Sequence, residues 1–311
     1  MSFSTRVKKE LCHIESNTML KVSELAGIVR MDGSILIDAN KNISLELVSE
    51  HINVAQLVYT GFKNLFKVDC NISIYKHKKL KKNNRYVITI LNQPQIRSVL
   101  YSLGMMDENG MLFYIGIPEE LIDRDDKRRA YLRGVFLGGG SVSDPNKNYH
   151  LEIVTNSEIY AELIQKIIGF YGIETKISFR KENVILYIKE SEQISDFLAL
   201  IGAYEALLDF ENIRINKNMR NQVNRRVNCE TANVSKSVDA AQKQIQYIKL
   251  IEMNMGIDHL PESLKIIADL RLKFPEASLK ELGEKLLPPI GKSGVNHRMR
   301  RLEKIAESLK G

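Results

Sequence analysis

The chain contains two copies of one segment, and this internal repeat restricts its N-terminal part to a duplicated fold. One copy includes Leu25–Ser34 (LAGIVRMDGS) and the other includes Leu132–Ser141 (LRGVFLGGGS). Further matches follow at nearly constant separation, so the copies cover about residues 20–104 and 128–203. Two copies are too few for a solenoid, and the expected packing is therefore a pseudo-twofold domain.

The hydrophobic pattern of each copy predicts a helix, two strands, a helix, two strands and a final helix. Alternating apolar residues at 42–49 and 149–155 indicate strands with one buried face. Helical spacing covers Val54–Phe66 and Ile159–Phe170. We therefore predict an α+β protein in which a duplicated αββαββ domain is followed by an all-α domain.

One carboxylate distinguishes the two copies. When their Gly and Ser positions are aligned, Asp32 of the first copy corresponds to Gly139 of the second. Metal-dependent cleavage of a phosphodiester needs oxygen ligands from both sides of the site. The missing acid therefore predicts a protein that binds nucleic acid without cutting it.

Two αββαββ copies, each opened by such a glycine-containing helix, resemble the LAGLIDADG homing endonucleases. The resemblance implies that the two helices pack along the pseudo-dyad, and that the sheets form a saddle for DNA. It also implies that each helix ends in a metal-binding carboxylate, a role that Asp32 matches and Gly139 does not. We expect no catalytic residue, no metal and no cofactor; the alternative is a metal-dependent LAGLIDADG-type endonuclease.

A strongly basic segment, residues 76–85, lies between two predicted strands of the first copy and contains no acid. Its possible phosphate contacts are Lys78, Lys79, Lys81 and Lys82. The corresponding turn of the second copy, residues 180–183, is almost neutral. The segment is also consistent with a solvated hairpin tip. The saddle is consistent with a surface for protein contacts or for packing against the chain's own C-terminal region.

The last fifty residues predict three short helices. The first begins near Pro261, and the second begins at the capping box Ser278–Glu281 (SLKE). We expect Ser293 to cap the third helix after a tight turn at Ile290-Gly291. The apolar stripe of the third helix consists of Val295, Met299, Leu302 and Ile305.

The opposite side of the third helix is basic and contains an asparagine. Three helices with this final helix match the helix-turn-helix pattern, in which the last helix enters the DNA major groove. Asn suits adenine and Arg suits guanine by bidentate hydrogen bonding. The expected DNA-binding residues are Lys292, Ser293, Asn296, His297, Arg298, Arg300, Arg301 and Lys304. A merely solvated amphipathic helix is the alternative.

The composition agrees with a polyanionic partner and gives few other indications of function. The formal net charge is +7 and the sequence pI is about 9.1. The three cysteines are scattered, which favours a reducing cytoplasm and gives no metal-ligand spacing. No apolar stretch approaches the roughly 18 residues of a membrane span, and no small-molecule site is evident.

A degenerate LAGLIDADG domain joined to a helix-turn-helix resembles the WhiA family of bacterial regulators. The most specific local matches are Val227–Asn233 and Lys292–Arg298. The resemblance implies sequence-specific binding to double-stranded DNA, on the nucleoid, in control of sporulation transcription, cell division or chromosome segregation. It also implies partners among other transcription or division proteins.

The predicted domain organisation is a LAGLIDADG-like domain at 1–215, a linker at 216–233 and the helix-turn-helix domain at 234–311. The linker is open to two interpretations, a rigid helix or a hinge. Oligomeric state is open as well, because the repeat already supplies an internal twofold symmetry.

Overall fold

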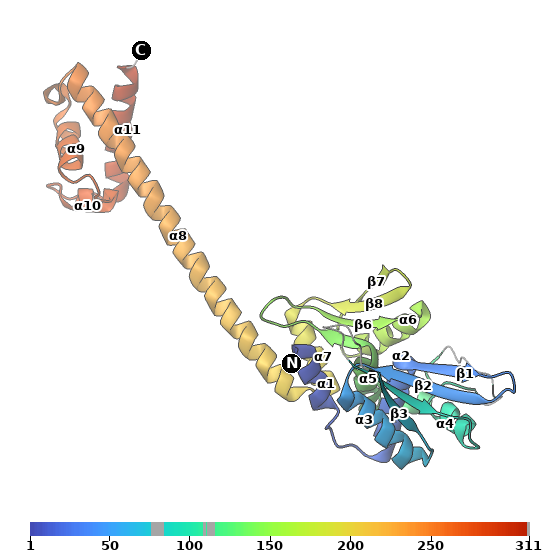
Figure 1. Cartoon of the computed structure of the whole chain (residues 1–311). Helices are drawn as coiled ribbons and strands as arrows, with labels where there is room; N and C mark the ends of the chain where they lie inside the picture. Colours follow the sequence, from blue (N-terminus) through green and yellow to red (C-terminus); the bar gives the residue numbers. More distant parts are fainter. Residues whose placement is uncertain (76–83, 108–109, 111–115, 310–311) are drawn as a thin grey trace. The chain divides into compact units, whose positions relative to one another are not determined.

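A computed structural model describes residues 1–75, 84–107, 110 and 116–309 (Figure 1). The chain divides into two compact units, residues 1–217 and 218–311. Each unit has its own hydrophobic core. None of the described helices is long and apolar enough to cross a membrane.

The first unit begins with α1 (Phe3–Leu11) and then runs through one order of elements twice. The first half comprises α2 (Thr18–Asp32), β1 (Gly33–Ile37), β2 (Ile43–Ser49), α3 (Ile52–Gly61) with its π-helical extension η1 (Phe62–Phe66), β3 (Asn71–Tyr75), β4 (Arg85–Ile90) and α4 (Ile96–Ser102). After the 3-10 turn η2 (Glu119–Leu121), the second half comprises α5 (Asp125–Gly139), β5 (Gly140–Val142), β6 (Leu151–Thr155), α6 (Glu158–Gly169), β7 (Lys176–Arg180), β8 (Asn183–Ile188) and α7 (Ser191–Ile201). The predicted duplicated αββαββ fold is confirmed.

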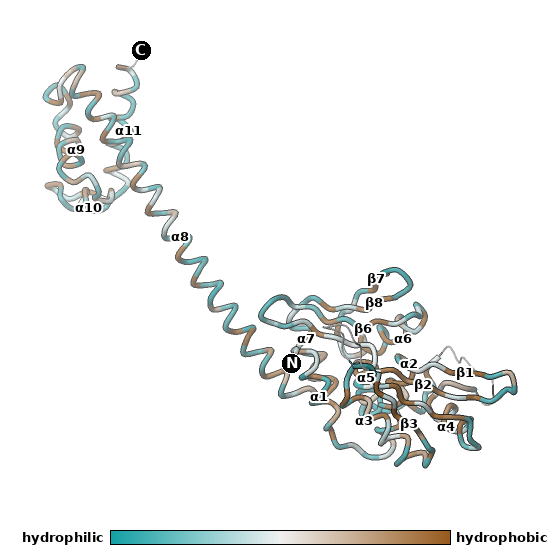
Figure 2. The backbone as a smooth tube through the Cα atoms, viewed as in Figure 1, coloured by the Kyte–Doolittle hydropathy of each residue, from teal (hydrophilic) through white to brown (hydrophobic). Residues whose placement is uncertain are grey.

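Each half forms one antiparallel sheet of four strands. The strand orders are β1-β2-β4-β3 and β5-β6-β8-β7, so the two sheets have the same topology. The register agrees as well, since Leu45 pairs with Ile90 and Leu151 pairs with Ile188. Alternate residues of β2 are buried. Hydrophobic segments of the chain lie within the helices and strands of this unit (Figure 2).

Helices α2 and α5 pack against each other at the centre of the first unit, and two glycines permit their close approach. A Cβ on Gly27 would lie 2.8 Å from the backbone nitrogen of Val135. A Cβ on Gly134 would lie 2.9 Å from the carbonyl carbon of Glu24. Any larger residue at either position would therefore push the helices apart.

Helix α8 (Tyr204–Asn254) runs from the first unit into the second. The carboxylate of Glu10 accepts hydrogen bonds from the backbone N–H groups of Glu205 (2.7 Å) and Ala206 (2.9 Å), which satisfies part of the first turn. The linker predicted at 216–233 is helical throughout. This stretch contains neither proline nor glycine to interrupt the helix.

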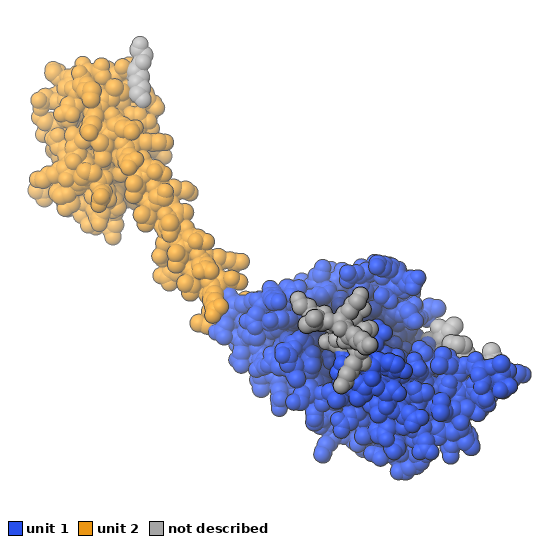
Figure 3. Space-filling model, in the orientation of Figure 1, with its two compact units in different colours: residues 1–217 blue, residues 218–311 orange. Residues whose placement is uncertain are grey.

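The second unit, shown in orange in Figure 3, contains the rest of α8 and a small helical core. It continues through the 3-10 turn η3 (Ile257–His259), α9 (Glu262–Lys273), α10 (Leu279–Glu284) and α11 (Lys292–Ser308). The buried side chains come from all four α-helices: Ile248, Ile251, Leu264, Ile267, Ala268, Leu282, Val295, Met299, Leu302 and Ala306. The three predicted C-terminal helices are therefore present.

Candidate nucleic-acid interface

The N-terminus of α10 is fixed by the predicted capping box. The Ser278 hydroxyl accepts a hydrogen bond from the Glu281 backbone N–H at 3.3 Å, and the Glu281 carboxylate accepts one from the Ser278 N–H at 2.7 Å. Later in α10, the Ile290 N–H donates to the Gly283 carbonyl at 3.1 Å. A Cβ on Gly283 would collide with the carbonyl oxygen of Ile290, so a glycine is needed where the chain returns along α10.

Helix α11 begins differently from the prediction. The expected cap at Ser293 was wrong: the N-cap residue is Gly291, and Ser293 is an exposed residue within the first turn. The Gly291 carbonyl accepts hydrogen bonds from Gly294 (2.9 Å) and Val295 (3.2 Å), which starts the helix before Ser293. The turn between α10 and α11 is also longer than predicted, because it covers 285–291. Gly291 has no side chain with which to cap the first N–H groups, and such groups favour an anion.

The two predicted faces of α11 are present. Val295, Met299 and Leu302 are buried in the core, and Ile305 is half-buried against it. Away from the core lie the exposed side chains of Lys292, Ser293, His297, Arg300, Arg301 and Lys304, with Asn296 half-buried among them. The structure therefore exposes six of the eight predicted residues along one helix, and Asn296 lies half-buried beside them.

Arg298, the eighth predicted residue, is oriented toward α9. Its side chain is half-buried, and one guanidinium nitrogen donates to the Ser263 carbonyl at 3.4 Å. Arg298 thus lies at the border between the core of the second unit and its basic surface.

The basic face of α11 belongs to a stretch without acids. No Asp or Glu occurs from Lys285 to Leu302, and this stretch contains five Lys and Arg residues besides His297. Glu303 is the first acid to follow. An exposed helix face of this charge attracts phosphates, and its exposed first turn contributes partial positive charge as well.

Arg271 supports the loop between α9 and α10, and this role was not predicted from the sequence. Its side chain is buried, and one guanidinium nitrogen donates to the carbonyl oxygens of Ala277 (2.6 Å) and Pro275 (3.2 Å). These bonds hold the loop that leads into the capping box, while burial lowers the pKa of Arg271. A signal was present, since Arg271 follows Leu264 and Ile267 on the buried face of α9.

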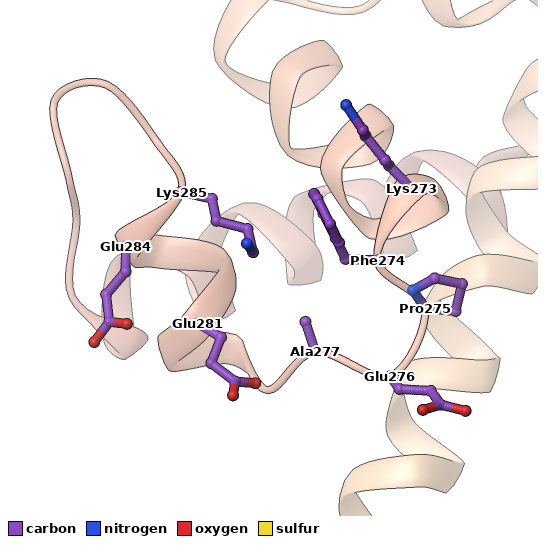
Figure 4. A pocket seen from close by; sticks show the side chains of 8 residues that line it. All are labelled: Lys273, Phe274, Pro275, Glu276, Ala277, Glu281, Glu284 and Lys285. Atoms are coloured by element: carbon purple, nitrogen blue, oxygen red, sulfur yellow. The ribbon is translucent and has the colours of Figure 1, made fainter.

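A cavity of about 810 Å³ lies beside this loop, between the end of α9 and α10 (Figure 4). Its lining includes three acids, Glu276, Glu281 and Glu284, and the Lys285 ammonium lies 4.2 Å from the centre of the Phe274 ring. The lining contains no residue of α11. The cavity is therefore separate from the basic face, and its carboxylates do not suit phosphate.

In the first unit, Asp32 ends α2 and Gly139 ends α5. A Cβ on Gly139 would lie 2.6 Å from the Val154 carbonyl oxygen and would collide with the Met31 methyl group. A second carboxylate is therefore excluded by the packing at this position, as well as absent from the sequence.

The side chain of Lys8 places a positive charge near the C-terminal ends of α2 and α5. Its ammonium donates to the carbonyl oxygens of Leu137 (2.9 Å) and Gly138 (3.3 Å). Burial lowers the pKa of Lys8 to about 8, although Asp32 opposes this shift. Burial raises the pKa of Asp32 to about 6, against the effect of Lys8.

The residues around Asp32 therefore do not fit the divalent metal of the endonucleases. Gly139 stands in place of the second carboxylate, and the nearby charge that acts on Asp32 is that of the Lys8 ammonium. The described part of the chain contains no group of three or more His, Cys, Asp or Glu residues that could hold a metal. Lys8 was not predicted from the sequence, although its neighbour Val7 lies on the apolar stripe of α1 with Phe3 and Leu11.

The outer faces of the two sheets are weakly charged over the described residues. Glu46 and Glu152 occupy equivalent places, opposite Thr89 and Tyr187 on the neighbouring strands. Basic residues occur nearer the strand ends, at Arg85, Lys176 and Arg180. The predicted phosphate contacts Lys78, Lys79, Lys81 and Lys82 lie outside the described residues.

Three family models match the chain in succession. They are the WhiA N-terminal LAGLIDADG-like domain at residues 18–106, the WhiA LAGLIDADG-like domain at 128–220 and the WhiA C-terminal HTH domain at 223–306. The matches agree with the two halves of the first unit and with the helices of the second.

Named relatives and one solved structure resemble the whole chain. A "Probable cell division protein WhiA" of Clostridium botulinum is 47% identical, over 100% of this chain and 99% of its own length. A protein of the same name from Clostridium tetani is 48% identical, over 99% and 98%. The crystal structure of full-length DUF199/WhiA from Thermatoga maritima is 28% identical, with a TM-score of 0.60 over 99% of both chains.

Proposed function

This chain belongs to the WhiA family, and we propose that it is a non-enzymatic, sequence-specific DNA-binding protein. It acts on double-stranded DNA of the bacterial chromosome, where it regulates cell division, chromosome segregation or sporulation transcription. The names of its relatives support a role in division, and the HTH domain supports DNA as the ligand.

The observation that carries this proposal is the exposed N-terminal part of α11, which contains no acid up to Leu302. Its N-terminal half enters the major groove, as the last helix of a helix-turn-helix does. Asn296 and Arg300 are placed to read base edges, and Arg301 and Lys304 to bind phosphates. Lys292 and the first-turn N–H groups hold a further phosphate.

The remaining predicted residues have smaller parts in the proposed interface. Ser293 and His297 are exposed beside the base-reading side chains and supply further hydrogen bonds to DNA. Arg298 holds α11 against Ser263 of α9 and neutralises DNA at the edge of the interface.

The paired helices of the first unit support the absence of nuclease activity in this proposal. Cleavage in the manner of the endonucleases requires two acids around divalent metal. Here the packing around Gly139 rejects one acid, and Lys8 supplies a cation beside the other. The first unit then serves as a scaffold or as a protein-docking surface, with transcription or division proteins as partners.

The test compares two double variants that each remove two positive charges from the second unit. Arg300→Ala/Arg301→Ala removes charge from α11, whereas Lys273→Ala/Lys280→Ala removes exposed charge from α9 and α10. DNA binding by the full-length proteins is measured as a function of salt. The proposal predicts a large loss only for the α11 variant. Equal affinities for all three proteins would contradict the assignment of the interface to α11.

A further inference from the structure

One stretch of α8, residues 218–240, is exposed on every side and lies entirely within the second unit. A helix that buries no face receives no stabilisation from a core. Its composition does not favour an isolated helix either, since it contains five Asn and four Val residues, which are weaker helix formers than Ala or Leu. Neither packing nor helix propensity explains this sequence, which points to a role for its surface.

Four polar residues of this stretch form a line along the helix. Asn218, Asn221, Arg225 and Asn228 follow one another at spacings of three, four and three residues. Residues at such spacings lie on one side of an α-helix. All four side chains are exposed. We call this line the Asn/Arg stripe.

The surroundings of the Asn/Arg stripe are positively charged. No acidic residue occurs between Glu211 and Glu230. Among the described residues no carboxylate pairs with Arg225, whereas Arg226, on a different side of the helix, pairs with Glu230 at 3.1 Å. The stripe therefore offers a cation and several amides to a negatively charged ligand.

Asn and Arg side chains on a continuous basic helix have the chemistry that reads DNA. The Asn amide forms two hydrogen bonds with adenine in the major groove, and the Arg guanidinium forms two with guanine. The major groove admits an α-helix, and basic continuous helices bind there. We infer that the Asn/Arg stripe is a second DNA-contacting element, which enters a major groove beside the one occupied by α11. This inference rests on the proposed function of α11.

The length of α8 fits this arrangement. Arg225 precedes Ile248, which belongs to the core of the second unit, by 23 residues. At 1.5 Å per helical residue these positions are about 34 Å apart, which is about one turn of B-DNA. The next major groove on the same side of a duplex lies at a similar distance along its axis.

The experiment uses two triple variants of the full-length protein. Asn221→Ala/Arg225→Ala/Asn228→Ala removes three of the four stripe residues. Asn216→Ala/Arg226→Ala/Asn233→Ala removes the same residue types from α8 positions outside the stripe. Alanine favours the helix, so both variants keep α8 helical, which circular dichroism verifies. The probe is a duplex that the wild-type protein selects from random sequences about four helical turns long.

We expect the stripe variant to bind this duplex at least about tenfold more weakly, and the control variant to stay within about twofold of wild type. In a hydroxyl-radical footprint, the stripe variant loses protection about one helical turn from the α11 site and keeps the rest. Equal affinity and an unchanged footprint would overturn the inference while leaving the function of α11 intact. Equal losses in both variants would also overturn it, because they would reflect charge alone. If the wild-type protein selects no duplex, the proposed function itself fails.

The exposed thiol of Cys229 gives an independent readout, since it adjoins Asn228. Bound duplex should slow alkylation of Cys229 in the wild-type protein, and much less in the stripe variant. Cys70 is buried and serves as an internal reference. A rate for Cys229 that saturating duplex leaves unchanged would contradict the inference.

Discussion

Arg133 donates a hydrogen bond of 2.6 Å to the carboxylate of Glu24, and this ion pair joins the two halves of the duplicated unit. The side chains are only 8% and 4% exposed. Burial raises the pKa of Glu24, and the charge of Arg133 opposes that shift. The pair therefore depends on both partners, because either charge alone would be buried without compensation.

Removal of one partner of the Arg133–Glu24 pair should lower the free energy of unfolding considerably. We expect Arg133→Met to lower the free energy of unfolding by about 3–5 kcal/mol, because Glu24 is left buried and unpaired. Arg226→Met breaks the exposed pair with Glu230 and should cost less than about 1 kcal/mol. Urea unfolding of both variants measures the difference. Similar costs for the two would show that the buried pair does not hold the halves together.

Lys8 should make stability depend on alkaline pH. Its pKa is about 8 in the folded chain and 10.5 in the unfolded chain, so between these values the unfolded state binds the extra proton. Stability attributable to Lys8 therefore rises from pH 8 to 10.5, by about 3 kcal/mol at 1.4 kcal/mol per pKa unit. Lys8→Met should lack this rise. Parallel pH profiles of unfolding for the two proteins would contradict the buried position of the ammonium.

Two glycine substitutions test the packing that excludes the second acid. Gly139→Ala forces a methyl group against Val154 and Met31 and should destabilise the protein by about 1–3 kcal/mol. Gly169→Ala, near the end of α6, meets no atom within 4 Å and should be neutral or stabilising by up to about 1 kcal/mol. Thermal unfolding distinguishes the two outcomes. An unaltered melting temperature for Gly139→Ala would mean that a side chain fits there after all.

Local patterns were sufficient to predict much of the fold. The alternation in Ile43–Ser49 and the repeat around Gly27 and Gly134 identified the strands and the central helices. The capping box at Ser278 and the apolar stripe of α11 were also correct, because both depend on residues within a few turns of each other.

Features that depend on distant or backbone contacts were missed. Lys8 bonds to a carbonyl oxygen 129 residues away, and no side-chain pattern marks that partner. Arg271 likewise binds backbone carbonyls of a loop. The start of α11 was misassigned because Ser293 is a good cap by residue type, whereas the backbone of Gly291 starts the helix.

Asn296 and Lys304 should differ in how they affect DNA binding. We expect Asn296→Ala to weaken binding to the preferred sequence by about 1–3 kcal/mol and to relax specificity at one base pair. Lys304→Ala should weaken binding to all sequences alike and reduce the salt slope by about one. Competition binding against single-base variants of the selected duplex separates these effects. A uniform loss with Asn296→Ala would place this side chain on the backbone instead of the bases.

The most direct test of DNA binding without cleavage is a single titration in the presence of Mg²⁺. The full-length protein and Arg300→Ala/Arg301→Ala are added to end-labelled duplex, and each sample is run on a native gel and on a denaturing gel. We predict saturable binding by the wild-type protein, a marked loss in the variant and intact strands throughout. Cut strands that depend on Asp32, or binding that the variant retains in full, would contradict the account.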